Sequence, residues 1–210
     1  TLGSAYVLRK YGATTENPLR LNFKAGIIPV SNEGDRSFMQ HPPAQILHEL
    51  IPSKMIAEAL GIPLSSLDEN LPIKVVTTGF PALFVPINSF STINWIAINI
   101  QTLNEVLDPL KIDMIYPFCC ETLKPYNTIH SRAFAPGLGI LEDPATGSVA
   151  GAMGAYWASL SNEVDISMVI EQGYEMQRPS LIHVEVSNRE IQKIRVGGQC
   201  QSVFTGLIDL

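Results

Sequence analysis

The sequence predicts an α+β fold built on a mostly antiparallel, strongly bent sheet, and two observations carry this prediction. Short segments with strand-like alternation follow one another along most of the chain, whereas few segments have helical periodicity. Hydrophobic residues make up 46% of the 210 residues and charged residues only 16%, so the chain can bury a sizeable core. This length suits one large domain or two small ones.

Turn residues and caps place the individual elements. We expect helices over residues 2–10, 54–60, 103–107 and 148–160, with Ser53 capping the second helix and Gly61 ending it. Small residues dominate the last of these helices, so it is expected to be buried within the sheet. The expected strands are 21–23, 26–30, 37–40, 73–78, 83–87, 114–118, 128–134, 181–186, 191–196 and 202–205.

The most informative segment covers residues 132–156. It reads as a strand, a tight Pro- and Gly-containing loop and the start of a helix. Pro144 excludes helical backbone at Asp143, which therefore lies on a constrained loop. Thr146 and Ser148 are cap-type residues directly before the small apolar run. A helix is expected to begin between them.

This arrangement has a chemical consequence. Free N–H groups and the positive end of the helix dipole can hold an anionic group such as a carboxylate, and Gly147 lets a ligand approach closely. Asp143 could then accept a hydrogen bond from a ligand amine or hydroxyl, or relay a proton. The alternative is a structural loop in which Asp143 only caps a buried helix.

The segment from Glu142 to Ser148, Glu-Asp-Pro-Ala-Thr-Gly-Ser, resembles the signature of the phenazine-biosynthesis PhzF-like proteins, which share the diaminopimelate epimerase-like fold. Arg-Ala-Phe-Ala-Pro-Gly-Leu-Gly precedes it at 132–139. Further matching segments occur in order at 1–8, 26–30, 38–43, 75–81 and 172–180. The resemblance extends from Thr1 to about Gly206.

The resemblance implies two similar halves, each a curved sheet around a central helix, with the active site between them. Residues 1–50 would be the remainder of the first half, residues 51–197 the second half, and residues 198–210 a C-terminal strand that returns to the first half. In such proteins Gly-His-Ala or Gly-His-Pro normally precedes the segment that begins here at Thr1, that His contributes to the active site, and an acid/base glutamate lies further upstream. The sequence is therefore expected to correspond to the larger C-terminal portion of a PhzF-like protein.

Composition and cysteine usage argue against several classes of partner. A net charge of −6 without a Lys/Arg cluster argues against nucleic acid and anionic membranes, and no apolar run is long enough to span a bilayer. Cys119, Cys120 and Cys200 have no metal-site spacing, so no metal is expected, and one of the vicinal pair should point inward. Reduced cysteines and the resemblance indicate a cytoplasmic protein, and the resemblance implies a homodimer.

The remaining polar candidates have structural interpretations. His41 precedes Pro42 and is interpreted as a turn or linker residue more readily than as a ligand contact. Arg132 could balance Glu142 or a ligand carboxylate, and a loop-bracing ion pair is the commoner outcome. A structural role is also expected of three other histidines and two turns, namely His48, His130, His183, residues 78–81 and residues 172–180.

Two hypotheses of function follow. The first, implied by the resemblance, is a cofactor-independent isomerase or epimerase that moves a proton on a small carboxylate-bearing substrate. Asp143 would be catalytic, and Gly147, Ser148 and Thr146 would form the substrate-binding site. Gly147 and Ser148 would hold the substrate carboxylate, while Thr146 would cap the helix and shape the loop; no metal, nucleotide or flavin is required. The second is a catalytically silent metabolite-binding or scaffold protein of the same fold.

Overall fold

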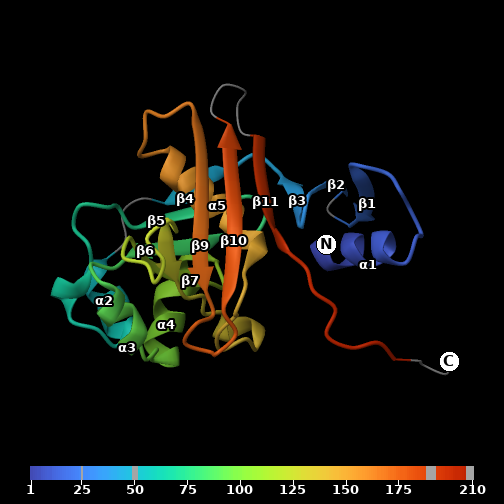
Figure 1. Cartoon of the computed structure of the whole chain (residues 1–210). Coiled ribbons are helices and arrows are strands. Elements are labelled where there is room, and N and C mark those ends of the chain that lie inside the picture. Colours follow the sequence, from blue (N-terminus) through green and yellow to red (C-terminus); the bar gives the residue numbers. More distant parts are fainter. Residues whose placement is uncertain (25, 49–51, 188–192, 207–210) are drawn as a thin grey trace. The chain divides into compact units, whose positions relative to one another are not determined.

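The computed structural model describes residues 1–24, 26–48, 52–187 and 193–206, and the chain divides into two compact units (Figure 1). The first unit contains residues 1–40 and 197–210, and the second contains residues 41–196. The chain crosses between them within strands β3 (Arg36–His41) and β11 (Lys193–Gln199). The predicted assignment of residues 1–50, 51–197 and 198–210 to epimerase-like halves stays a prediction.

The first unit is built on the helix α1 (Leu2–Lys10), which has the predicted bounds. The strands β1 (Leu19–Phe23) and β2 (Gly26–Glu33) pair antiparallel, and β2 pairs antiparallel with β3. Ala5, Leu19 and Val30 form the small buried core of this unit. The helix therefore packs on the strands through a short apolar stripe.

The C-terminal segment belongs to the first unit as an extended tail. Lys10 Nζ donates a hydrogen bond to Ser202 Oγ at 2.7 Å, and Tyr11 Oη lies 3.4 Å from Thr205 Oγ1. The strand predicted over 202–205 is wrong, since residues 201–206 have no regular secondary structure. Side-chain contacts with α1, in place of a backbone ladder, hold this segment. Residues 207–210 lie outside the described residues.

The second unit contains a mixed sheet in the order β11-β10-β9-β8-β7-β6-β5-β4. The β6/β7 and β8/β9 pairs are parallel, while β4/β5, β5/β6, β7/β8 and β9/β10 are antiparallel, which confirms the predicted α+β fold. Its remaining strands are β4 (Gln45–His48), β5 (Lys74–Thr77), β6 (Ala82–Pro86), β7 (Ile115–Cys119), β8 (Ile129–Ser131), β9 (Asp165–Gln172) and β10 (Ser180–Ser187). Residues 191–192, which begin the strand predicted over 191–196, lie outside the described residues. The sequence prediction had missed β4 and β9.

Short helices cover one part of this sheet. The helices are α2 (Ser53–Leu60), α3 (Phe90–Trp95) and α4 (Ile100–Leu107), and 3₁₀ turns at Leu64–Ser66 and Asp108–Leu110 follow α2 and α4. Gly61 ends α2 in the left-handed conformation with φ 67°, as predicted. Ser53 does not cap α2, because it is the first helical residue and Pro52 occupies the cap position. Asn99 caps α4 by accepting a hydrogen bond from the Thr102 N–H.

The helix α5 (Gly147–Ala158) is the axis of the second unit (Figure 1). It contacts β5 and β6 as well as β9 and β10, so the sheet curves around it. A Cβ atom on Gly154 would lie 2.5 Å from Val184 Cγ1 and 2.8 Å from Val186 Cγ2. Glycine at this position lets the helix backbone approach the sheet closely, as the small-residue pattern predicted.

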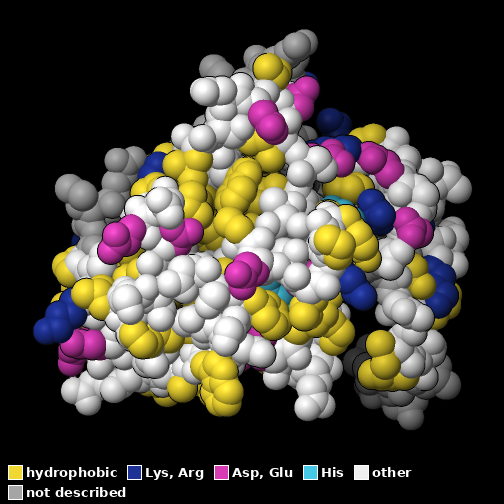
Figure 2. Space-filling view, turned by 60° about the vertical axis from the view of Figure 1, so that its left-hand side comes forward, with side chains coloured by type: hydrophobic (Ala, Val, Ile, Leu, Met, Phe, Trp, Pro, Cys, Tyr) yellow, Lys and Arg dark blue, Asp and Glu magenta, His cyan; other side chains and the backbone are white. Residues whose placement is uncertain are grey.

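One face of the molecule can be compared with the predicted absence of a Lys/Arg cluster. On the face that Figure 2 shows, the Lys and Arg side chains of described residues are interspersed with Asp and Glu. Within the described part of the chain, no helix combines the length and apolarity needed to cross a membrane.

The close approach at Gly154 generates a prediction. Gly154→Ala should lower the free energy of unfolding, because overpacking costs about 1–3 kcal/mol and exceeds the roughly 1 kcal/mol that alanine gains over glycine in a helix. Gly3→Ala in α1 is the matched control, since a Cβ there meets no atom within 4 Å. Urea denaturation measures both variants. Equal stability of Gly154→Ala and wild type would contradict the close packing.

Candidate active site

The loop that carries Asp143 is fixed by hydrogen bonds before the helix starts. The Asp143 N–H donates to Ala133 O at 2.9 Å, which ties the loop to the chain just after β8. Thr146 Oγ1 donates to Asp143 Oδ2 at 2.8 Å. Asp143 is half-buried and Thr146 is buried, so the carboxylate stands at the edge of the packed interior.

The start of α5 lies where the sequence predicted it, but Thr146 caps the helix differently. Its side chain forms no cap hydrogen bond because its hydroxyl points to Asp143. Its carbonyl oxygen instead accepts from the N–H groups of Val149 and Ala150, each at 3.1 Å. Thr146 is therefore the N-cap residue, as predicted, although its side chain makes no cap hydrogen bond.

The first backbone donors of α5 differ in availability. The Gly147 N–H donates to Ala145 O at 3.2 Å. The Ser148 N–H forms no hydrogen bond with another described residue, and Ser148 is exposed. An anionic ligand at this helix start would meet the Ser148 N–H and hydroxyl first.

Gln172 at the end of β9 joins the loop to the sheet, and the sequence singled it out only as the first residue of the turn 172–180. It is completely buried. Its Nε2 donates to Asp143 O at 2.6 Å and to Thr146 Oγ1 at 2.8 Å. Its Oε1 accepts from the Thr146 N–H at 3.2 Å and from Tyr116 Oη at 3.1 Å. The segment 172–180 that follows forms the predicted turn between β9 and β10.

Arg132 braces the same loop from its other end. Its Nε and Nη2 donate to the two carboxylate oxygens of Glu142, each at 2.8 Å. Its Nη1 donates to the carbonyl oxygens of Ile93 and Ile96 at the end of α3. The bracing role expected for Arg132 is confirmed, and its guanidinium is engaged on both sides.

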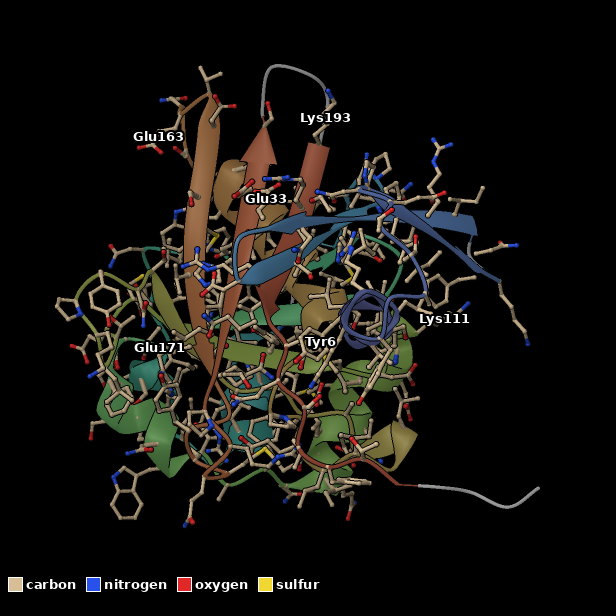
Figure 3. All side chains as sticks on the ribbon, turned by 45° about the vertical axis from the view of Figure 1, so that its right-hand side comes forward. Tyr6, Glu33, Lys111, Glu163, Glu171 and Lys193 are labelled. Carbon is tan, nitrogen blue, oxygen red and sulfur yellow. The ribbon has the colours of Figure 1, made fainter. Side chains whose placement is uncertain are left out.

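A buried charge cluster lies beside these groups on β8 and β9. His130 Nδ1 is 2.9 Å from Glu171 Oε2, and its Nε2 is 2.7 Å from Glu175 Oε1. Glu171 also accepts hydrogen bonds from the N–H groups of Leu123 and Lys124 (Figure 3 labels Glu171). The structural role expected of His130 is confirmed, because it ties the two carboxylates together in the interior.

The cluster changes the acidity of its members. Burial lowers the pKa of His130, but hydrogen bonds and charges from Glu175 and Glu171 outweigh burial and raise that pKa above 6.5. Burial raises the pKa of Glu171, but donors from the Leu123 N–H and His130 outweigh it and lower that pKa below 4.5. Burial also opposes ionisation of Glu175, and hydrogen bonding to His130 lowers its pKa below 4.5 as well. The charged forms are thus favoured together.

His41 is more buried than a linker residue would be. It ends β3, and its ring lies where a Cβ on Gly151 of α5 would stand. His41 Nδ1 is 3.0 Å from Thr78 Oγ1, and its Nε2 has no hydrogen-bond partner among the described residues. Burial lowers the pKa of His41 to about 4, so the ring is neutral at neutral pH.

The cysteines remain structural. Cys119 is buried and Cys120 is exposed, as predicted for neighbouring strand residues. Burial raises the pKa of the Cys119 thiol to about 12, which leaves it protonated and unreactive. Among the residues that the structure describes, no three His, Cys, Asp or Glu side chains gather in a way that could hold a metal ion.

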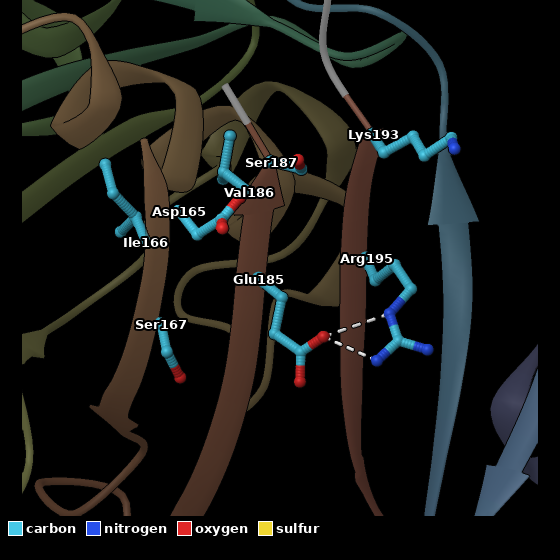
Figure 4. A pocket seen from close by; sticks show the side chains of 8 residues that line it. All are labelled: Asp165, Ile166, Ser167, Glu185, Val186, Ser187, Lys193 and Arg195. Atoms are coloured by element: carbon cyan, nitrogen blue, oxygen red, sulfur yellow. Dashed lines mark hydrogen bonds and ion pairs between the residues drawn. The ribbon is translucent and has the colours of Figure 1, made fainter. Parts of the chain in front are cut away.

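A separate cavity of about 370 Å³ lies over β9, β10 and β11 (Figure 4). Glu185 and Arg195 form an ion pair in it, with Arg195 Nε 3.0 Å from Glu185 Oε2. Val184 and Val186 face α5, so Glu185 between them points to the opposite face of the sheet. None of the residues predicted for the active site lines this cavity. Its lining residues are Asp165, Ile166, Ser167, Glu185, Val186, Ser187, Lys193 and Arg195.

Comparisons with known proteins give a consistent answer. The model of the family described as "Phenazine biosynthesis-like protein" (PhzC-PhzF) matches residues 1–206. The uncharacterized isomerase YfhB of Bacillus subtilis is 31% identical over 212 residues, covering 98% of this chain and 70% of that protein. An uncharacterized isomerase of Clostridium acetobutylicum is 30% identical, covering 96% of this chain and 72% of that protein.

A solved structure agrees with these sequence matches. The crystal structure of a PhzF-family phenazine biosynthesis protein from Bacillus anthracis matches with a TM-score of 0.85 at 28% identity. The match covers 94% of this chain and 71% of that chain.

The buried charge cluster makes stability depend on pH from both sides. The raised pKa of His130 gives stability that is fully present below about pH 6.5 and is lost as the pH rises through the folded-state pKa. The lowered pKa values of Glu171 and Glu175 give stability that is present above about pH 4.5 and is lost as the pH falls. The contribution of the cluster to the free energy of unfolding should therefore peak between these values.

His130→Gln tests this pH dependence, because it should remove the loss of stability that occurs as the pH rises. The measurement is urea denaturation of wild type and variant across this pH range, and the difference between their free energies of unfolding should shrink as the pH rises above 6.5. Glu69→Gln, at an exposed carboxylate, is the control and should leave the profile unchanged. A difference that stays constant with pH would contradict the charged His130.

Proposed function

Because the chain belongs to the phenazine biosynthesis-like (PhzC-PhzF) family, we propose that it is an isomerase that moves a proton on a small carboxylate-bearing metabolite. The observation that carries the proposal is the placement of Asp143, with its Oδ2 held by Thr146, directly before the open first turn of α5. The printed names of the relatives support an isomerase and name no substrate.

In this proposal the start of α5 binds the carboxylate of the substrate. The Ser148 N–H and hydroxyl donate to it, and the absence of a side chain at Gly147 leaves room for its approach. The positive end of the helix dipole adds to the attraction. Thr146 does not contact the substrate through its hydroxyl, which is engaged by Asp143. Thr146 shapes the site through the loop.

Asp143 provides the polar contact next to the reacting carbon. With Oδ2 engaged by Thr146, Oδ1 forms no hydrogen bond with another described residue and can accept one from a substrate amine or hydroxyl. The acid/base glutamate that the family resemblance implies would move the proton, and Asp143 would help to set its protonation state. Such a step needs no redox cofactor, because a proton shift leaves the oxidation level of the molecule unchanged.

The expected cytoplasmic location and homodimer remain predictions that follow from the family resemblance. The substrate class follows from the helix start, since a backbone N–H and a hydroxyl at the positive end of a dipole favour an anion.

The test is the exchange of solvent deuterium into a substrate. The full-length protein is incubated in D₂O with a panel of small acids that carry a C–H next to a carbonyl or a double bond, and incorporation is followed by mass spectrometry. Wild type should exchange at least one of them, and Asp143→Asn should slow the exchange roughly 10²-fold, the lower end of general acid–base contributions.

Asp165→Asn is the control for this experiment. It makes the same carboxylate-to-amide change at the separate cavity and should exchange like wild type. Equal exchange by Asp143→Asn and wild type would overturn the role of Asp143. A wild-type protein that binds acids from the panel but exchanges none would overturn the isomerase and favour the silent binding protein.

A further inference from the structure

We propose that Gln172 is the positioning residue of the active site, fixing Asp143 as a hydrogen-bond acceptor through Thr146. Gln172 is completely buried, and both ends of its amide are engaged by the loop that carries Asp143. Neither the sequence motifs nor the proposed reaction assigns it a role. The expected effect of Gln172 on the reaction rate rests on the proposed function, whereas its expected effect on the Asp143 loop rests on the structure alone.

The hydrogen bonds run in one direction. Gln172 Nε2 is only a donor, so Thr146 Oγ1 accepts from it and must turn its own proton elsewhere. That proton points to Asp143 Oδ2 at 2.8 Å. Asp143 Oδ2 is therefore held as an acceptor, and Oδ1 is left for the ligand.

The orientation of the Gln172 amide is itself fixed. Its Oε1 accepts from the Thr146 N–H and from Tyr116 Oη, and these donors would face a donor if the amide were turned over. Tyr116 Oη is the donor to Gln172, because Gln172 Oε1 can only accept. The series of donors thus begins at Tyr116 in β7 and ends at Asp143.

The next residue holds the backbone of β9 against the loop. Gly173 has φ +81°, and a Cβ on it would stand 2.6 Å from Pro144 O. Any side chain there would push β9 away from the residue that follows Asp143. Gln172 at the end of β9 and Gly173 directly after it therefore serve the same loop, the first through its amide and the second through having no side chain.

Two variants of similar length separate positioning from packing. Gln172→Met removes the hydrogen bonds of the amide. Gln172→Glu keeps an acceptor for the Thr146 N–H but cannot donate to Thr146 Oγ1, so the hydroxyl can turn from Asp143 to the new carboxylate. Asn127→Asp is the matched control, because it makes the same amide-to-acid change at a buried residue that donates to Glu171.

The first readout needs no substrate. Hydrogen exchange at the Thr146 N–H should be accelerated at least about tenfold in Gln172→Met, the factor that corresponds to the loss of one typical hydrogen bond. It should stay within about threefold of wild type in Gln172→Glu and in Asn127→Asp, since both retain the acceptor of this N–H. Unchanged exchange in Gln172→Met would overturn the inference.

The second readout is deuterium exchange into a substrate. Both Gln172 variants should slow this deuterium exchange at least about tenfold. Asn127→Asp should not slow it, even if it lowers the free energy of unfolding as much as the Gln172 variants do. A merely structural Gln172 would give Gln172→Glu a rate near wild type, since the Thr146 N–H remains protected, and that result would overturn positioning. If wild type exchanges deuterium into none of the acids, only the proposed function is overturned. Hydrogen exchange at the Thr146 N–H then decides whether Gln172 is a positioning residue.

Discussion

The close approach of α5 to the surrounding sheet is the constraint on which the candidate site depends. Gly154 lies against Val184 and Val186, and Gly151 lies against the ring of His41, so side chains at either position would push the helix outward. Strands β5 and β6 and strands β9 and β10, which are separated by β7 and β8 in the sheet, contact the same helix. The first turn of α5 is therefore fixed relative to β9, and the Asp143 loop has one path between them.

Two adjacent residues at the end of β9 each hold a neighbouring segment of the chain. Adjacent residues of a strand point to opposite faces, and here Glu171 meets His130 and the chain at 123–127 while Gln172 meets the Asp143 loop. Arg132, directly after β8, works in the same way by joining Glu142 to α3. Two loops and a helix end are thus held by buried polar side chains of neighbouring strands, and loss of either strand end would release several of them at once.

Local sequence signals predicted the parts of this arrangement that depend on neighbours in the chain. The small residues after Thr146 predicted a buried helix, and Gly61 predicted a helix end. The alternation of Ile166, Met168 and Ile170 could have identified β9, and Ser89 could have marked the start of α3. By contrast, Gln172 and Asp143 are 29 residues apart, and no local pattern states that an amide will meet a loop so far away. The sequence likewise predicted Thr146 as the helix cap, but it did not predict that the hydroxyl of Thr146 accepts a hydrogen bond from Gln172, 26 residues away.

The completeness of the polar network distinguishes the Asp143 loop from other buried polar groups. Buried polar atoms without partners are costly, and among the described residues they are Arg9 Nη1, His41 Nε2, Asn127 Oδ1 and Glu175 Oε2. None of them belongs to Gln172, Thr146 or Asp143, whose buried polar atoms are engaged by one another. A fully satisfied network holds one geometry, since any rotation within it leaves a donor facing a donor. Such a loop is preorganised and presents only Asp143 Oδ1 and the start of α5 to a ligand, as a site for a small anion requires.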